Sequence, residues 1–291
     1  MLNGMLLLLG TGICWAGLAA VVAAGRSRHA PIVLVQPFSA ILVLVFTGWT
    51  FFPSGGMLRA GSAFYTQTAC LIAAGAANYF MLILVQKAME SGRSGVVWAF
   101  TQSSMICPFL MGIVIFGEHP APGKIGGILF ILTALGIFAS AKKSAEKSSG
   151  KWLTASLCAF ALAGTAQCFA SLPSYCQLEG MTAMRRMLLT QTGIVLAFLL
   201  DCPFRKPTGL RERNVWLFSA CFGGLNLCAL LCFYNGLNLL ANAKCASAGY
   251  PAAQGISIAL FFLCTARRNK EKPAAWAAMI LLCTGILLFA L

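Results

Sequence analysis

Long apolar runs, separated by short polar connections, constrain this chain more than any other feature of its sequence. Of its 291 residues, 59% are hydrophobic and 10% are charged. A helix needs about 20 mostly apolar residues to cross a bilayer, and ten such windows fit along the chain without overlap. Lipid cannot satisfy backbone amides, and the alternation of a barrel strand is missing. The sequence therefore predicts an all-α membrane protein with ten transmembrane helices.

The ten predicted windows divide into two groups of five. The first group covers residues 3–24, 31–52, 62–86, 94–116 and 122–141, and the second covers 151–171, 183–200, 214–238, 245–265 and 273–291. The first window is expected to remain as a helix and not to be cleaved as a signal peptide. The reason is that its nearest basic residues, Arg26 and Arg28, follow the apolar run.

The basic residues, which give a formal net charge of +14, are scattered over the connections, so no nucleic-acid partner is expected. The connections after odd-numbered windows hold 16 Lys and Arg residues, and those after even-numbered windows hold 5. Basic connections stay in the cytoplasm, which predicts a multi-pass protein of the inner (plasma) membrane with both termini outside the cytoplasm. Arg185 and Arg186 fit this pattern least and are able to attract an anionic substrate or a lipid headgroup.

The 13 cysteines lie almost entirely inside apolar windows and form no CxxC pair. Cys228 and Cys232 share a helix face, but a zinc site needs two more ligands nearby. The only histidines, His29 and His119, fall in predicted connections. The cysteines are therefore interpreted as small buried hydrophobic residues, and neither a metal nor another cofactor is expected.

The two halves of the chain match each other at an offset near 150 residues. A shift of 148 places Asn78 on Asn226, and a shift of 155 places Gln36 on Gln191. A period of this length is too long for a solenoid repeat and suits a duplicated membrane unit.

The duplication predicts a first five-helix repeat over residues 1–141, a polar linker over 142–151 and a second repeat over 152–291. Because each repeat has an odd number of helices, the second must enter the membrane inverted relative to the first. Two inverted five-helix repeats are typical of transporters.

Neutral polar and aromatic side chains inside the windows are the candidates for lining a transport pathway. Burying an amide without a partner costs about 2–7 kcal/mol, so these side chains should face one another or a hydrated cavity. A structural hydrogen bond between helices remains the alternative for each of them. The predicted substrate-binding residues are Trp15, Gln36, Asn78, Tyr79, Gln102, Gln167, Gln191, Asn226 and Tyr234.

Two prolines and one further aromatic residue carry separate predictions. Pro108 and Pro251 lie inside windows and remove helical hydrogen bonds, so they are predicted hinges for gating, with static kinks as the alternative. Trp98 lies near the end of a window and is predicted to anchor its helix at the membrane interface.

All seven acidic residues fall in connections or near predicted helix ends. A proton-coupled pump, or an exporter of hydrophobic cations, generally needs a carboxylate inside the membrane. The distribution of acids therefore argues against both classes.

The stretch PFLMGIVIFGE, from Pro108 to Glu118, precedes a window that contains Gly126, Gly127 and Gly136. Together with the helix count and the repeat, this pattern resembles the ten-helix, EamA-type branch of the drug/metabolite transporter superfamily. Trp15 and the neighbouring pair of Asn78 and Tyr79 also stand where that family commonly has such residues.

The second repeat departs from the family pattern, since Ala266 and Arg267 stand where the family has its Gly-Glu pair. The charge count departs from it too, because family members usually keep their termini in the cytoplasm. The resemblance implies a secondary transporter, more commonly an exporter.

The leading hypothesis is a secondary transporter, not an enzyme, that moves a small neutral or zwitterionic metabolite such as an amino acid by alternating access. The chain has no P-loop that would couple it directly to ATP. It is expected to contact the metabolite and membrane lipids as a monomer or homodimer. The alternatives are a lipid-carrier flippase subunit, a non-transporting membrane partner and, with the least support, an intramembrane enzyme.

Overall fold

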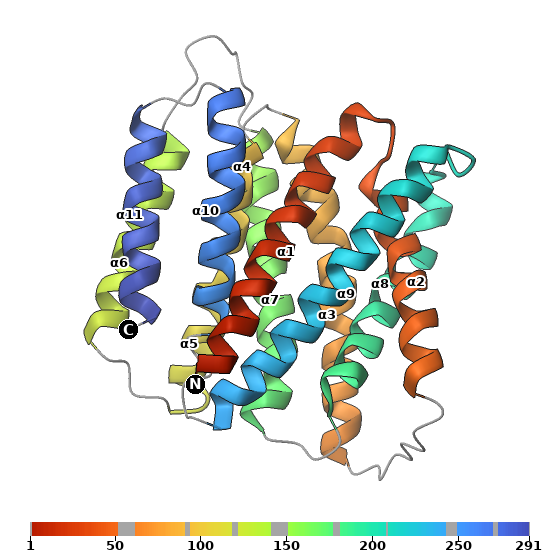
Figure 1. Ribbon diagram of the computed structural model, residues 1–291, viewed down its shortest axis with the longest axis horizontal. Coiled ribbons are helices and arrows are strands. Elements are labelled where there is room, and N and C mark those ends of the chain that lie inside the picture. Colours follow the sequence, from red (N-terminus) through yellow and green to blue (C-terminus); the bar gives the residue numbers. More distant parts are fainter. Residues whose placement is uncertain are drawn as a thin grey trace.

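The computed structural model describes residues 2–51, 62–90, 94–117, 122–140, 151–176, 181–207, 209–242, 249–269 and 273–290. The regular structure in these ranges is entirely helical (Figure 1). The first half contains α1 (Leu2–Ser27), α2 (Ile32–Phe51), α3 (Ser62–Met89), α4 (Ser94–Gln102), the 3-10 turn η2 (Ser103–Met105), α5 (Ile106–Val114) and α6 (Pro122–Ser140). The second half contains α7 (Lys151–Tyr175), α8 (Ala183–Arg205), α9 (Arg213–Asn242), α10 (Gly249–Asn269) and α11 (Pro273–Ala290).

Eight helical stretches within the described ranges are long and apolar enough to cross a membrane: α1, α2, α3, α4 with α5, α7, α8, α9 and α10. The apolar stretches of α6 and α11, Ile125–Phe138 and Pro273–Leu288, are shorter. The chain is therefore an all-α, multi-pass membrane protein, as the sequence predicts. The predicted linker lies outside the described residues except for Lys151, which begins α7.

The fourth predicted window is not one continuous helix, because α4 ends at Gln102 and η2 separates it from α5. Pro108 has no N–H with which to pair the carbonyl of Ser104, so a regular α-helix would leave that carbonyl without its bond. Ser103 also turns its hydroxyl back onto the chain, where Oγ donates to the carbonyl of Ala99 at 2.8 Å. Serine side chains that bond back in this way favour bends, and the chain tightens here into a 3-10 turn.

Helices from the two halves interleave in the bundle. α1 packs along α9 and α10, α3 packs along α7 and α8, and α6 packs along α11. The ribbon in Figure 1 shows α1 lying across the cyan α9, with the two ends of the chain at the same end of the bundle. Segments far apart in sequence therefore form the main contacts.

Two glycines allow α3 and α8 to approach closely. A Cβ atom added to Gly75 would lie 1.9 Å from the carbonyl oxygen of Thr190, and one added to Gly193 would lie 2.0 Å from that of Ile72. Real Cβ atoms cannot come this near to a backbone oxygen, so only glycine fits at either position. Small residues at such crossings let membrane helices pack through their backbones.

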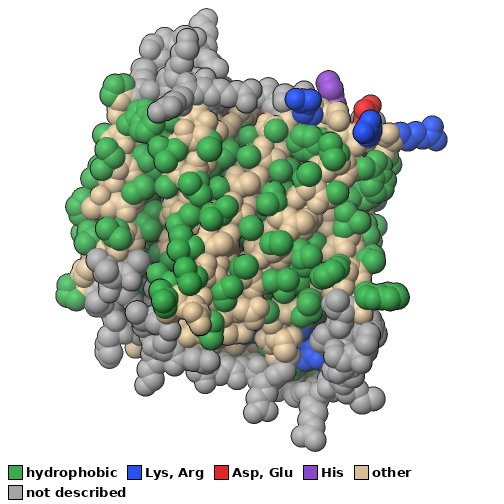
Figure 2. All heavy atoms as spheres, viewed as in Figure 1, with side chains coloured by type: hydrophobic (Ala, Val, Ile, Leu, Met, Phe, Trp, Pro, Cys, Tyr) green, Lys and Arg blue, Asp and Glu red, His purple; other side chains and the backbone are tan. Residues whose placement is uncertain are grey.

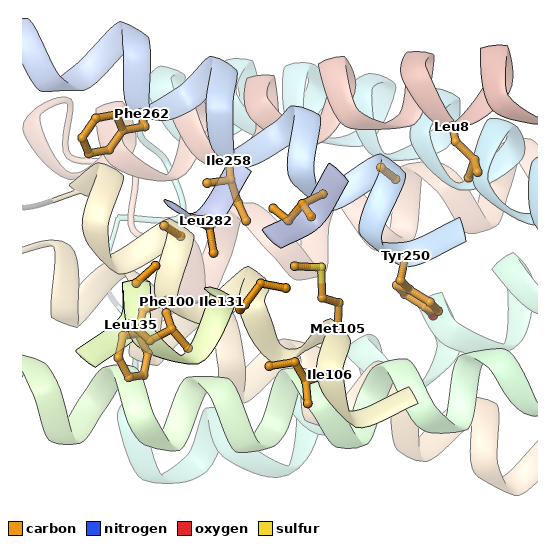
Figure 3. Packing of buried hydrophobic residues seen from close by; sticks show 14 of the residues in the cluster. Leu8, Phe100, Met105, Ile106, Ile131, Leu135, Tyr250, Ile258, Phe262 and Leu282 are labelled. Atoms are coloured by element: carbon orange, nitrogen blue, oxygen red, sulfur yellow. The ribbon is translucent and has the colours of Figure 1, made fainter. Parts of the chain in front are cut away.

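Apolar side chains fill the bundle and also cover its outside. Figure 3 shows Phe100, Ile258, Phe262 and Leu282 packed in the cluster that joins α4, α6, α10 and α11. In Figure 2 the middle of the visible face is hydrophobic, and the charged side chains drawn in colour lie near its ends. A belt of exposed apolar side chains between charged ends is what contact with lipid requires.

Candidate functional site

A cavity of about 140 Å³ lies between helices of both halves, namely α1, α3, α4, α7, α8, α9 and α10. The described residues of its lining are aromatic, amide, hydroxyl or apolar, and none of them is charged. Its polar and aromatic lining consists of Trp15, Asn78, Trp98, Gln102, Gln167, Thr190, Gln191, Phe222, Asn226, Phe233, Tyr234, Tyr250 and Gln254.

Seven of the nine predicted substrate-binding residues line this cavity: Trp15, Asn78, Gln102, Gln167, Gln191, Asn226 and Tyr234. They come from six helices, so the fold gathers side chains that are spread from position 15 to position 234. Asn78 and Asn226, which align when the two halves of the sequence are shifted by 148, lie on α3 and α9 and both contribute to the lining.

Gln36 and Tyr79 do not line the cavity. Gln36 is fully buried in α2, and neither its amide nitrogen nor its amide oxygen has a hydrogen-bond partner among the described residues. Tyr79 is also fully buried, and its hydroxyl donates to Oδ2 of Asp201 at 3.0 Å. That carboxylate also pairs with Arg205 one turn further along α8. Tyr79 therefore bonds α3 to α8 in this structure and does not face the cavity.

Several amides around the cavity are only half satisfied. Gln167 donates from Nε2 to Oγ of Ser104 at 2.7 Å, which connects α7 to the 3-10 turn. Yet Oε1 of Gln167, Gln191 and Gln254 has no hydrogen-bond partner among the described residues. A buried acceptor without a partner is costly, so these three oxygens are ready to accept hydrogen bonds from a ligand.

Aromatic rings form one wall of the cavity. Phe233 is central to it, with ring centroids 5.2 Å from Trp15, 4.7 Å from Tyr250 and 5.7 Å from Tyr234. The hydroxyl of Tyr250 donates to the backbone carbonyl of Gln167 at 3.2 Å, which fixes that ring between α10 and α7. Ring faces of this kind accept apolar groups and cationic groups alike.

Arg186 lies behind this aromatic wall and is only 3% exposed. Its Nε donates to the carbonyl of Met181 at 3.0 Å, and one terminal nitrogen donates to Oγ of Ser174 at 2.6 Å. Its Cζ lies 5.7 Å from the ring centroid of Tyr234. The sequence identified this arginine as an exception to the charge pattern that is able to attract an anionic substrate or a lipid headgroup, but its burial was not foreseen.

The interface prediction for Trp98 is wrong. Trp98 is 3% exposed, lines the cavity and donates from its indole nitrogen to Oγ of Ser257 at 2.9 Å. Its position near a helix end is typical of interface aromatics. Tyr250 also lies near a helix end, and for that reason the sequence did not identify it as a cavity residue. Gln254 is a neutral polar side chain inside an apolar window, which is the feature that identified the other amides.

The two predicted hinge prolines occupy different settings. Pro108 is the third residue of α5 and follows the break at η2. Pro251 is the third residue of the described α10, where its missing N–H costs no bond within that helix. The reason for expecting a hinge at Pro251, a lost helical hydrogen bond, therefore does not apply to the described helix.

Comparison with known proteins shows the fold alone. No protein-family model and no curated protein matches the chain. Among solved structures, a protein described as "Crystal structure of protein" superposes with a TM-score of 0.63 over 98% of this chain and 95% of its own length. The two sequences are 15% identical.

Proposed function

We propose that this chain is a secondary transporter of the drug/metabolite superfamily, built from two inverted five-helix repeats that together cross the membrane ten times. It moves a small neutral or zwitterionic metabolite, such as an amino acid, by alternating access, in the direction of export. The observation that carries the proposal is the cavity, an uncharged polar and aromatic chamber inside an apolar bundle, with a lining drawn from both halves.

The packing of the helices supports the inverted repeat. Taken in order, α1 corresponds to α7, α2 to α8, α3 to α9, α4 with α5 to α10, and α6 to α11. α1 packs on α9 and α10, while α7 packs on α3, α4 and α5. α2 packs on α9 as α8 packs on α3, and the counterparts α6 and α11 pack on each other. An exchange of partners between halves is expected when a two-fold axis relates them.

The chemistry of the cavity supports an uncharged or zwitterionic substrate. Taking a net charge into the middle of a membrane costs several kcal/mol unless an opposite charge is present. The described lining offers amides, hydroxyls and ring faces, which bind polar groups without requiring a net charge.

The orientation is tested by reporters fused after Leu291. We propose that the end carrying the basic connections faces the cytoplasm, which places the termini outside. Alkaline phosphatase fused there should be active, and green fluorescent protein should stay dark. A bright fluorescent fusion with an inactive phosphatase fusion would reverse the orientation.

Transport is tested by counterflow in proteoliposomes with radiolabelled neutral amino acids, L-leucine first. Asn78→Leu and Asn226→Leu should each lower kcat/KM about tenfold, since a lost hydrogen bond to substrate is worth roughly 1.4 kcal/mol. Asn235→Leu is the matched control, because Asn235 is exposed on α9 and bonds its own helix at the carbonyl of Leu231. Counterflow that is unchanged in both cavity variants would show that Asn78 and Asn226 do not bind the substrate. The absence of counterflow with any tested solute would favour a flippase subunit or a non-transporting partner.

A further inference from the structure

We infer that the substrate of this cavity carries a carboxylate and that Arg186 is the residue that binds it. The inference rests on the proposed transport function and narrows its substrate to zwitterions of the amino-acid type. It depends on the burial of Arg186, on its contact with a ring that lines the cavity and on amide oxygens in the lining that have no partner among the described residues.

Arg186 is a cation that the described residues do not neutralise. It is 3% exposed, and its recorded hydrogen bonds go to a backbone carbonyl and a serine hydroxyl. The described acidic residues Glu90, Asp201 and Glu212 form no ion pair with it, and Asp201 pairs with Arg205. A buried charge without a counter-ion is costly, and a guanidinium fork matches a carboxylate in a bidentate manner.

Arg186 lies at the end of the cavity marked by Thr190, Tyr234 and Tyr250. Thr190 is one helical turn further along α8, on the same face, and its hydroxyl donates to the carbonyl of Arg186 at 2.5 Å. Thr190 lines the cavity, and so does Tyr234, against whose ring the guanidinium packs. The Tyr234 ring therefore contacts the guanidinium and also lines the cavity, and a change in its side-chain rotamer would give a ligand access to Arg186.

The opposite pole of a zwitterion also finds matching groups. Gln191 and Gln254 are each 1% exposed, line the cavity and have an Oε1 without a partner among the described residues. An ammonium group donates three hydrogen bonds, so it suits buried amide oxygens of this kind.

Arg186 also couples binding to movement of this end of the bundle. Its hydrogen bond to Ser174 joins α8 to α7, and its contact with Tyr234 joins α8 to α9. A guanidinium has five N–H donors, and the recorded bonds use two of them, so the remaining donors are available to a ligand carboxylate. A carboxylate that draws the guanidinium toward the cavity would weaken its contacts with Ser174 and Tyr234, and alternating access requires coupling of this kind.

The test compares three solutes that differ only at the carboxylate: L-leucine, L-leucinamide and isopentylamine. Each competes against labelled L-leucine in counterflow, and each is titrated against the protein by intrinsic fluorescence, since Trp15 and Trp98 line the cavity. Wild type should bind leucine at least about thirtyfold tighter than either analogue, and Arg186→Gln should abolish this preference. Arg186→Lys should keep part of it, and Arg185→Gln, which removes the neighbouring charge, should keep all of it.

The outcomes separate this inference from the transport proposal. Counterflow of leucine with no preference over leucinamide would overturn the role of Arg186 and leave transport standing. A preference that persists in Arg186→Gln would also overturn it. If no solute shows counterflow, the transport proposal fails, and the fluorescence titrations then test the role of Arg186. Binding that requires both the carboxylate and Arg186 supports the inference. The absence of such binding overturns it.

Discussion

The helices α2 and α8 correspond in the proposed repeat, yet they contribute unequally to the cavity. α8 supplies Thr190 and Gln191 to the lining and holds Arg186 behind it, whereas the aligned Gln36 on α2 is sealed away from the cavity. The position that aligns with Arg186 at the same shift of 155 is Pro31, directly before α2. If the proposed duplication holds, it explains the scaffold, and the differences between α2 and α8 place the proposed specific chemistry in the second half.

The largest effect is expected where α8 crosses α3. Gly75→Ala should lower the free energy of unfolding by at least about 3 kcal/mol, because its Cβ would overlap the backbone of Thr190. The control is Gly223→Ala at the corresponding contact of α9 with α2, where the nearest atom is the carbonyl oxygen of Ser39 at 3.4 Å. This control should change stability by no more than about 1 kcal/mol. Thermal unfolding in detergent measures both, and equal losses would mean that the two crossings do not differ.

A second comparison substitutes the aligned glutamines. Gln191→Leu should lower kcat/KM for leucine about tenfold by removing a hydrogen-bonding group from the cavity. Gln36→Leu should leave transport unchanged and raise the free energy of unfolding by about 1–3 kcal/mol, because both of its buried amide atoms lack partners among the described residues. Counterflow kinetics and thermal unfolding check the pair. A transport defect in Gln36→Leu would return that residue to the site.

A third comparison concerns the polar contact between α3 and α8. Tyr79→Phe should lower the free energy of unfolding by about 2 kcal/mol, the value of a hydrogen bond to a carboxylate, and should leave KM unchanged. Tyr65→Phe is the control on the same helix, where the side chain is 64% exposed. A raised KM in Tyr79→Phe at unchanged stability would show that the tyrosine contacts substrate after all.

Much of the candidate site could be predicted because an amide inside an apolar window is conspicuous. That signal found Asn78, Asn226 and Gln191, all of which line the cavity. It could not separate them from Gln36, which has the same chemistry and an equally apolar setting. The difference lies in the rotation of α2 about its axis, which depends on how α2 packs against α8 and α9.

Aromatic residues were harder to assign, since the same side chain suits an interface, a core and a binding wall. Trp98 lies near a helix end, where sequence favours the interface, but contacts with α10 bury it. Arg186 is a similar case, because its position near the start of a window suited a lipid headgroup as well as an anionic substrate. Burial in both cases comes from neighbouring helices that are distant in sequence.

The sequence by itself determined that the chain is helical and membrane-embedded, because apolar segments of this length leave no other way to satisfy the backbone. It also supplied the polar side chains from which a cavity could be built. Tertiary structure alone decided which of them meet. Helices that are apolar on all sides carry little information about which face turns inward, so only close packing, as where Gly75 meets α8, sets each rotation.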